Sequence, residues 1–339
     1  ENMPDIRGLA AIYGLTYIPG PWIESLQLNK GTGSVMNGYE SIAGQINTEL
    51  RKPESAEKMY LNLFANEGGR LEANLNLAHR FKNEHWSTGL LLHGKNTTIK
   101  WDRNDDGFLD HPVGSQFIGL NRWRYTGENG IRFQAGVKGT FVDNTGGEME
   151  YNPSDNGGTN NVWGMHMKKE RIEGWMKIGL VDEALPWRSA ALQLSGVIHN
   201  QDSYFGATRY DATQESLYGN FIYQGILSNT NHKFKAGASF QGDWYLEQFA
   251  DTLFTREELV PGAYFEYTFK RFEQFSAVAG IRADYHNNYG LFFTPRLHMC
   301  YELSENSIFR ASAGRGLRTA SIIAENSGDV IQQIPSVIA

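Results

Sequence analysis

Residues 71–81 read LEANLNLAHRF, and apolar and polar side chains alternate through most of this stretch. The same alternation recurs at residues 131–141, 233–241 and 275–284. A period of two indicates β-strands with one apolar and one polar face. We expect these strands to present two opposite faces: Leu71, Leu75, Ile131, Val137, Phe275 and Ile281 on the apolar face, and Glu72, Arg80, Arg132, Lys138 and Arg282 on the polar face.

Composition supports an all-β chain and excludes several other classes. The 339 residues include 37 Gly and 13% aromatic residues, which favour strands and tight turns over helices. A net charge of −7 gives no attraction to nucleic acid, and the single cysteine, Cys300, excludes a disulfide framework. No run of about 18 apolar residues could form a transmembrane helix.

Strand length and loop length distinguish a membrane barrel from a soluble sandwich. The strands reach ten residues or more, which suits tilted membrane strands better than the five or six usual in sandwiches. Aromatic residues gather toward strand ends, as in the interfacial girdles of outer-membrane barrels. Short turns alternate with links that we expect to be long, at 101–113, 145–161, 202–214 and 250–259. The pattern predicts an antiparallel up-and-down transmembrane β-barrel whose apolar face contacts lipid.

About thirteen strands fit between residues 58 and 319. A bacterial barrel has an even number of strands, and an open sheet leaves backbone groups unpaired in lipid. We therefore expect the chain to be a fragment of a larger barrel, with residues 54–339 forming its incomplete wall. A soluble β-rich binding module stays open as an alternative, although strand length and loop asymmetry count against it.

Residues 1–53 follow another pattern. We expect a short strand at 22–29, a Gly-rich turn at 30–34, one or two helical turns at 35–42 and a second strand at 45–50. Gly residues in such a turn allow positive φ and close approach of the backbone. The turn is not a P-loop, because no Gly-Lys-Ser/Thr sequence closes it.

Two motifs carry a resemblance to a known family. The stretch 22–53, WIESLQLNKGTGSVMNGYESIAGQINTELRKP, resembles the end of the plug domain of TonB-dependent outer-membrane receptors. Residues 292–321, FFTPRLHMCYELSENSIFRASAGRGLRTAS, are similar to a mid-barrel motif of the same family. Asn37 departs from the plug motif, because the family usually has an aromatic residue there. The plug-motif matches are Lys30, Gly31, Ser34, Gly38, Ser41, Gly44, Ile46 and Asn47.

The resemblance implies that residues 1–53 are the C-terminal part of a plug domain. It also implies that a TonB box, the first half of the plug and roughly nine of twenty-two strands lie outside this chain. The implied function is TonB-energised uptake of a scarce nutrient across the outer membrane of a Gram-negative bacterium. The implied partners are TonB, outer-membrane lipid and a small-molecule or metal-chelate substrate of the ferric siderophore, cobalamin, heme or metal-complex class. A passive porin or adhesin is the alternative, but a porin needs a free lumen.

Residues 102–110, DRNDDGFLD, fit the first nine positions of an EF-hand-like calcium loop. Asp102, Asn104, Asp106 and Asp110 would supply side-chain oxygens, and Phe108 a carbonyl oxygen. Position twelve holds Val113 in place of the bidentate Glu, so the sequence predicts a weak extracellular calcium site, with a metal-free acidic turn as the alternative.

Other candidate sites are weaker. Met165-His166-Met167 contains soft ligands, but on a strand the two Met point away from the His, and we expect the Met side chains to face lipid. His93, His199 and His298 lie on predicted strands without metal-ligand spacing. No catalytic motif occurs, so we do not expect an enzyme.

Overall fold

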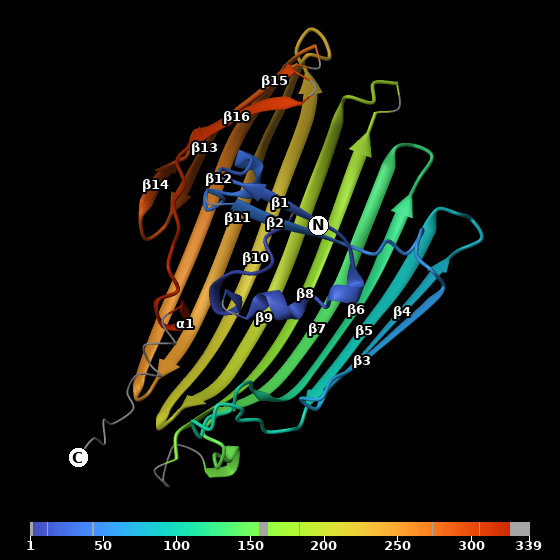
Figure 1. Ribbon diagram of the computed structural model, residues 1–339. Helices are drawn as coiled ribbons and strands as arrows, with labels where there is room; N and C mark the ends of the chain where they lie inside the picture. Colours follow the sequence, from blue (N-terminus) through green and yellow to red (C-terminus); the bar gives the residue numbers. More distant parts are fainter. Residues whose placement is uncertain are drawn as a thin grey trace.

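The computed structural model describes residues 3–11, 13–42, 44–155, 162–182, 184–272, 274–304 and 306–325. These residues form one large antiparallel sheet and an N-terminal segment, residues 3–53, which lies on one side of that sheet (Figure 1). None of the helices in this part of the chain is long and apolar enough to cross a membrane.

The sheet contains fourteen strands in an up-and-down order. Along the chain they are β3 (Met59–Ala65), β4 (Arg70–Arg80), β5 (Trp86–Thr97), β6 (Val113–Thr126), β7 (Ile131–Gly147), β8 (Gly164–Val181), β9 (Ser189–Phe205), β10 (Thr208–Ile226), β11 (His232–Phe249), β12 (Thr252–Arg271), β13 (Phe275–His286), β14 (Gly290–Phe293), β15 (Arg296–Ser304) and β16 (Ser307–Gly314).

Thirteen of these strands lie on a sequential path, and β14 is an addition beside β13. β14 pairs with Ala283–His286, whereas β15 pairs with Phe275–Gly280. Together they act as two halves of one strand, interrupted at Thr294-Pro295, since Pro cannot donate a ladder hydrogen bond. The predicted number of about thirteen is therefore confirmed for the path. Within the described residues the sheet is open, with β3 and β16 at its edges.

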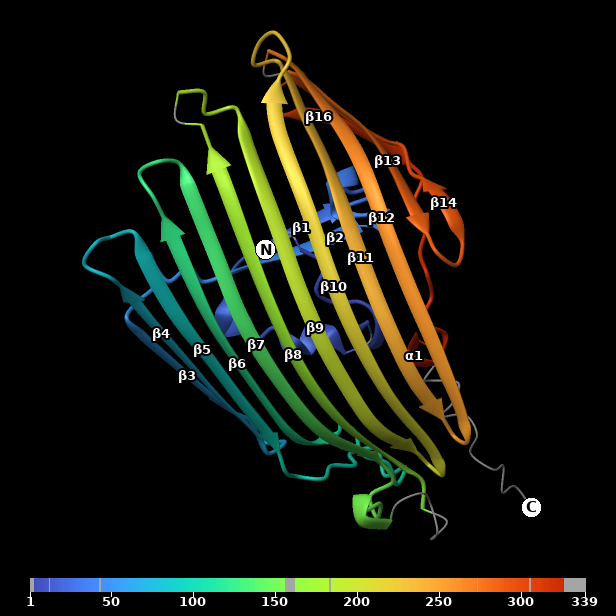
Figure 2. The ribbon, with the colours of Figure 1, turned by 180° about the vertical axis from the view of Figure 1, so that it is seen from behind.

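The sheet is apolar outside and polar inside, the reverse of a soluble protein. On β13, Ile281 is 52% exposed on one face, whereas Arg282 and Asp284 on the other are buried against the N-terminal segment. On β7, Val137 is exposed and Lys138 is buried. Figure 2 shows the sheet from behind, with the N-terminal segment on its far, concave side. The predicted barrel-type sheet is confirmed.

Two of the four expected long links are wrong. The stretches 202–214 and 250–259 lie mostly within strands of 17 to 20 residues, and the turns themselves contain only two residues, Gly206-Ala207 and Ala250-Asp251. Polar residues enter the outward face here, as where Asp202 lies directly opposite Asp211, so the apolar-outward alternation is interrupted. The other two links follow Thr97 and Gly147, at the lower end of the sheet in Figure 1.

The N-terminal segment has the elements that its sequence predicts. β1 (Ile23–Lys30) and β2 (Gly44–Leu50) form an antiparallel hairpin. Four short 3₁₀ helices complete the segment: η1 (Gly8–Ala10), η2 (Gly14–Tyr17), η3 (Gly20–Trp22) and η4 (Val35–Asn37). Trp22 is buried in the lumen against Leu91, Ile118 and Leu120 of the sheet, which anchors the base of the hairpin.

Candidate functional site

The candidate site is the contact between the N-terminal segment and the polar face of the sheet. Its strongest part is Arg296, the first residue of β15. Its guanidinium donates hydrogen bonds to the carbonyl oxygens of Gly33 (3.1 Å), Ser34 (2.9 Å) and Gly38 (2.7 Å). These carbonyls converge because the chain turns sharply at Gly31 (φ +83°) and Gly38 (φ +96°), where a side chain would be strained. The two stretches that carry the family resemblance therefore meet in space.

Arg282 on β13 makes the second contact with this turn. Its Nη1 donates to the carbonyl of Val35 at 3.1 Å, and its Nε donates to Asp284 Oδ2 at 2.8 Å. The Asp284 carboxylate thereby holds the guanidinium in place. Gly280 is needed beside it, because a Cβ there would lie 2.7 Å from Cγ1 of Val35. The wall is thus shaped to receive this turn.

The plug-motif residues divide into two groups. Gly31, Ser34 and Gly38 wrap around Arg296, and the Ser34 hydroxyl donates to Glu266 while accepting from the N–H of Met36. The N–H of Gly33 donates to the Ser41 carbonyl and closes the turn. The remaining residues lie on the hairpin: Lys30 and Gly44 face each other at one end, Ile46 is exposed, and Asn47 donates to Gln27.

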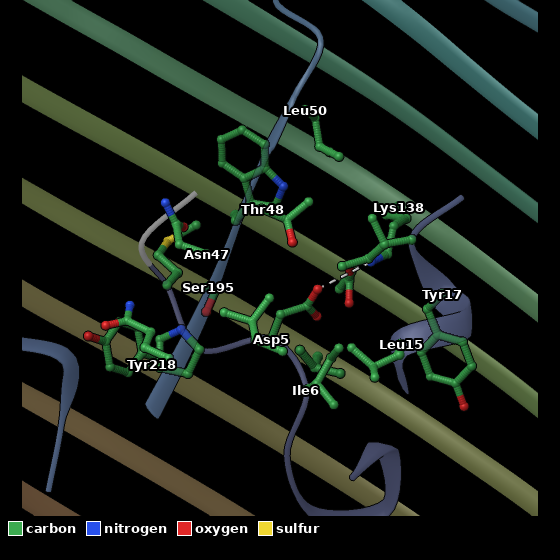
Figure 3. A pocket seen from close by; sticks show the side chains of 18 of the residues that line it. Asp5, Ile6, Leu15, Tyr17, Asn47, Thr48, Leu50, Lys138, Ser195 and Tyr218 are labelled. Carbon is green, nitrogen blue, oxygen red and sulfur yellow. Dashed lines mark hydrogen bonds and ion pairs between the residues drawn. The ribbon is translucent and has the colours of Figure 1, made fainter. Parts of the chain in front are cut away.

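A second charged cluster lies on β7 and β8, where Asp5 reaches across from the N-terminal segment (Figure 3). Its carboxylate contacts Lys138 at 3.5 Å and Arg171 at 3.0 Å, and Glu173 pairs with both cations. Burial raises the pKa of Asp5, but the Lys138 ammonium and the Arg171 guanidinium outweigh this effect and hold the pKa at about 2. Asp5 is therefore ionised at neutral pH, and it balances a wall cluster of two cations and one carboxylate.

A third group of polar contacts attaches residues 7–9 of the N-terminal segment to the sheet. Arg7 forms an ion pair with the buried Asp243 of β11. The N–H of Leu9 donates to Gln214 Oε1 at 2.9 Å, and Gly8 adopts φ +59° with no room for a Cβ against the same amide. Residues 5–9 are thus tied to β7, β8, β10 and β11.

A cavity of about 550 Å³ remains between the N-terminal segment and the wall. Figure 3 shows Leu15 and Thr48 on the segment side and Ser195 and Tyr218 on the wall side. Asp5 and Lys138 both line this cavity. The segment therefore covers the polar face without packing against all of it.

The predicted calcium ligands are hydrogen-bonded within their own loop. Asp102 accepts from the N–H groups of Asp106 (3.2 Å) and Gly107 (2.8 Å), and Asp106 accepts from the N–H of Phe108 and the amide of Asn104. Asp110 accepts from the N–H of Arg103 at 3.2 Å. Among the described residues, no group of three or more His, Cys, Asp or Glu side chains is placed to hold a metal ion. Calcium binding stays a prediction.

The expectation of lipid-facing Met side chains is wrong. Met167 is buried on the concave face, in a cluster with Leu9, Phe205, Tyr210 and Tyr245, and Met165 packs against that cluster. His166 points outward and contacts Asp143 at 2.9 Å, so the predicted separation of Met from His is confirmed. The reversal arises because this patch of the lumen is covered by the N-terminal segment and is locally apolar.

Several residues at the contact were missed by the sequence reasoning. Asp5, Arg171 and Asp243 belong to no motif, and the signal that could have identified the wall residues is charge on the polar face of strands. Charged side chains are expected wherever the lumen contains water. The sequence therefore does not distinguish the charged residues that contact the N-terminal segment from those that face water.

No model of a known protein family and no curated protein matches this sequence. Solved structures do match it. FauA, the alcaligin outer-membrane receptor of Bordetella pertussis, aligns with a TM-score of 0.72 and 11% identity over 91% of this chain and 52% of its own. The siderophore receptor PirA of Acinetobacter baumannii aligns with a TM-score of 0.74 and 12% identity, and the alignment covers 90% of this chain and 49% of PirA. The copper transporter OprC aligns with a TM-score of 0.69 and 14% identity, and the alignment covers 94% of this chain and 54% of OprC.

The chain spans about half the length of the solved structures that it matches. At these identities the likeness shows the fold and leaves the ligand open. The chain thus shares the fold of outer-membrane siderophore receptors, as the two motifs predicted.

Proposed function

We propose that this chain is part of a TonB-dependent outer-membrane receptor that actively takes up a scarce nutrient. In this proposal residues 1–53 are the C-terminal part of the plug domain and residues 54–339 are part of the transmembrane barrel. The receptor lies in the outer membrane of a Gram-negative bacterium, draws energy through TonB and catalyses no reaction.

The observation that carries the proposal is the occupied concave face. Three groups of charged residues, around Arg296, Asp5 and Arg7, attach the N-terminal segment to the wall. A passive porin needs a free lumen, and nothing in its function requires such attachments. A receptor that opens only when energised needs an occluding segment that is held firmly and reversibly.

The substrate class is proposed from the neighbours. The solved structures that match include receptors described for alcaligin, for siderophores and for ferric enterobactin, and a transporter described for copper. We propose a metal complex, with a ferric siderophore as the leading case. Cobalamin and heme are other members of the same nutrient class.

The test uses the full-length receptor in a host lacking its own iron receptors. Uptake of radiolabelled ferric siderophores, copper, cobalamin and heme is measured with and without TonB. Uptake of one substrate that requires TonB supports the proposal. Substrate flux that continues without TonB, together with a steady conductance in planar bilayers, would identify a passive porin.

A further inference from the structure

Residues 315–325 leave β16 and return across the concave side of the sheet. We call this segment the strap; it ends in the short helix α1 (Ile322–Glu325). Figure 1 shows it in red, running from β16 to α1 on the same side of the sheet as the N-terminal segment. Residues 315–321 of the strap belong to the mid-barrel motif, yet none of the contacts described above uses them.

The strap is attached to the wall through Arg256 on β12. The guanidinium donates to the Ala320 carbonyl at 2.9 Å and to the Ser321 hydroxyl at 3.3 Å. The same guanidinium lies 4.1 Å above the ring of Tyr245 on β11. Ala324 is buried beside Tyr245, Tyr210 and Met167, so α1 covers the apolar patch of the lumen.

The strap is also attached to the N-terminal segment, at two separate places. The N–H of Leu317 donates to the Tyr39 carbonyl at 3.2 Å, and the Tyr39 hydroxyl lies 3.4 Å from that of Thr319. Gly316 packs on Ile42 so closely that a Cβ would lie 2.5 Å from Cβ of Ile42. At the far end, Leu9 shares the buried cluster with Ala324.

We propose that the strap is a clamp that holds the N-terminal segment against the wall, and that release of α1 from the apolar patch loosens the segment. The physical basis is shared burial. Leu9 and Ala324 belong to one buried cluster with Met167, Tyr210 and Tyr245, so removal of either residue exposes part of that shared cluster to water. The proposal concerns coupling within the fold and can be tested without any substrate.

The experiment is hydrogen exchange, read by mass spectrometry, on the full-length receptor in detergent. Ala324→Asp places a charge in the buried patch, and Arg315→Gln is the matched control, because Arg315 is exposed on the same segment. We expect amides of Leu9, Ala10 and residues 37–42 to exchange at least about tenfold faster in Ala324→Asp and unchanged in Arg315→Gln.

Two results would overturn the proposal. One is faster exchange confined to residues 315–325, which would make the strap a passive cover. The other is equal acceleration along β7–β9, which would indicate general loosening of the barrel. If Ala324→Asp fails to fold, Arg256→Gln removes the guanidinium that attaches the strap to the wall and is read against the same two outcomes.

Coupling between two attachments is reciprocal, which gives an independent measurement. Leu9→Ala removes the shared cover from the other side. We expect the amides of residues 321–325 to exchange faster in this variant. Unchanged exchange in the strap would contradict the clamp.

Discussion

Arg296 donates a 2.9 Å hydrogen bond to the carbonyl of Ser34, although 262 residues separate them in the chain. The bond joins the turn of the N-terminal segment to the first residue of β15. A buried guanidinium with three carbonyl partners has fixed geometry, because its planar N–H groups point in set directions. This contact determines where the turn lies in the lumen.

The first prediction concerns this contact. Arg296→Ala removes the guanidinium donor from three carbonyls, of which that of Ser34 keeps the N–H of Asn37, and we expect it to weaken attachment of the segment by about 2–4 kcal/mol. The measurement is the rate of proteolysis within residues 31–38 of the purified full-length receptor, with thermal unfolding of the barrel beside it. Arg310→Ala is the control, because Arg310 is exposed on neighbouring β16. Equal cleavage rates in the two variants would show that Arg296 does not hold the turn.

The second prediction concerns the two faces of the sheet. Leu75 lies on the apolar face, opposite Leu61 and Leu92. Leu75→Arg should cost about 2–4 kcal/mol near the bilayer midplane. Leu253→Arg is the matched control; Leu253 lies next to the Ala250-Asp251 turn at the end of β12, where about 0–1 kcal/mol is expected. Reversible unfolding in lipid vesicles measures both, and equal costs would contradict the assignment of the faces.

How far the sequence predicts the structure depends on the period of each segment. Alternation identifies β4, β7, β11 and β13. A period of two places the apolar side chains on the face that contacts lipid and the polar side chains on the face that lines the lumen. It fails at Asp202 and Asp211, where the outward face is polar and the inward neighbours Tyr210 and Ala212 are buried in an apolar cluster, so the usual pattern is reversed. It also misassigns Met167, because an apolar residue can cover a lumen patch as well as face lipid.

The site was harder to predict than the fold. The motif around Ser34 and the motif containing Arg296 could each be identified, but no local property of either stretch indicates that they touch. Their contact depends on the register of every strand between β3 and β15. Asp5 was missed for the same reason, because its role depends on contacts with Lys138 and Arg171, which are distant from it in the sequence.

The third prediction is a pH dependence at Asp5. A depressed pKa means that the ionised carboxylate stabilises the contact. This stabilisation is complete above the ordinary pKa of 3.8 and is lost as the pH falls through about 2. The Asp5 side chain is 38% exposed, so solvent screening reduces the effect, and we expect about 1 kcal/mol.

The measurement for Asp5 is exchange of the amides of residues 6–9 in the wild type and in Asp5→Asn. At pH 7 the variant should exchange faster, and the difference should shrink as the pH is lowered from about 4 toward 2. The backbone amide of Trp22 serves as an internal reference for the exchange rates, because the Trp22 side chain packs on another part of the wall. A difference that is constant across this pH range would exclude an electrostatic role.

The fourth prediction concerns the loop at residues 102–110. Because Asp102 accepts from two backbone N–H groups, the loop is held by its own hydrogen bonds, and Asp102→Ala should loosen it by about 1 kcal/mol. Asp105→Asn is the control, since Asp105 is exposed in the same loop and Asn tolerates its φ of +55°. Limited proteolysis of the full-length receptor with and without millimolar calcium measures both effects. Calcium protection that is present in the wild type and lost in Asp102→Ala would establish the predicted ion site. Loosening in Asp102→Ala without any effect of calcium would show that the acidic side chains only cap the turn through their hydrogen bonds to backbone N–H groups.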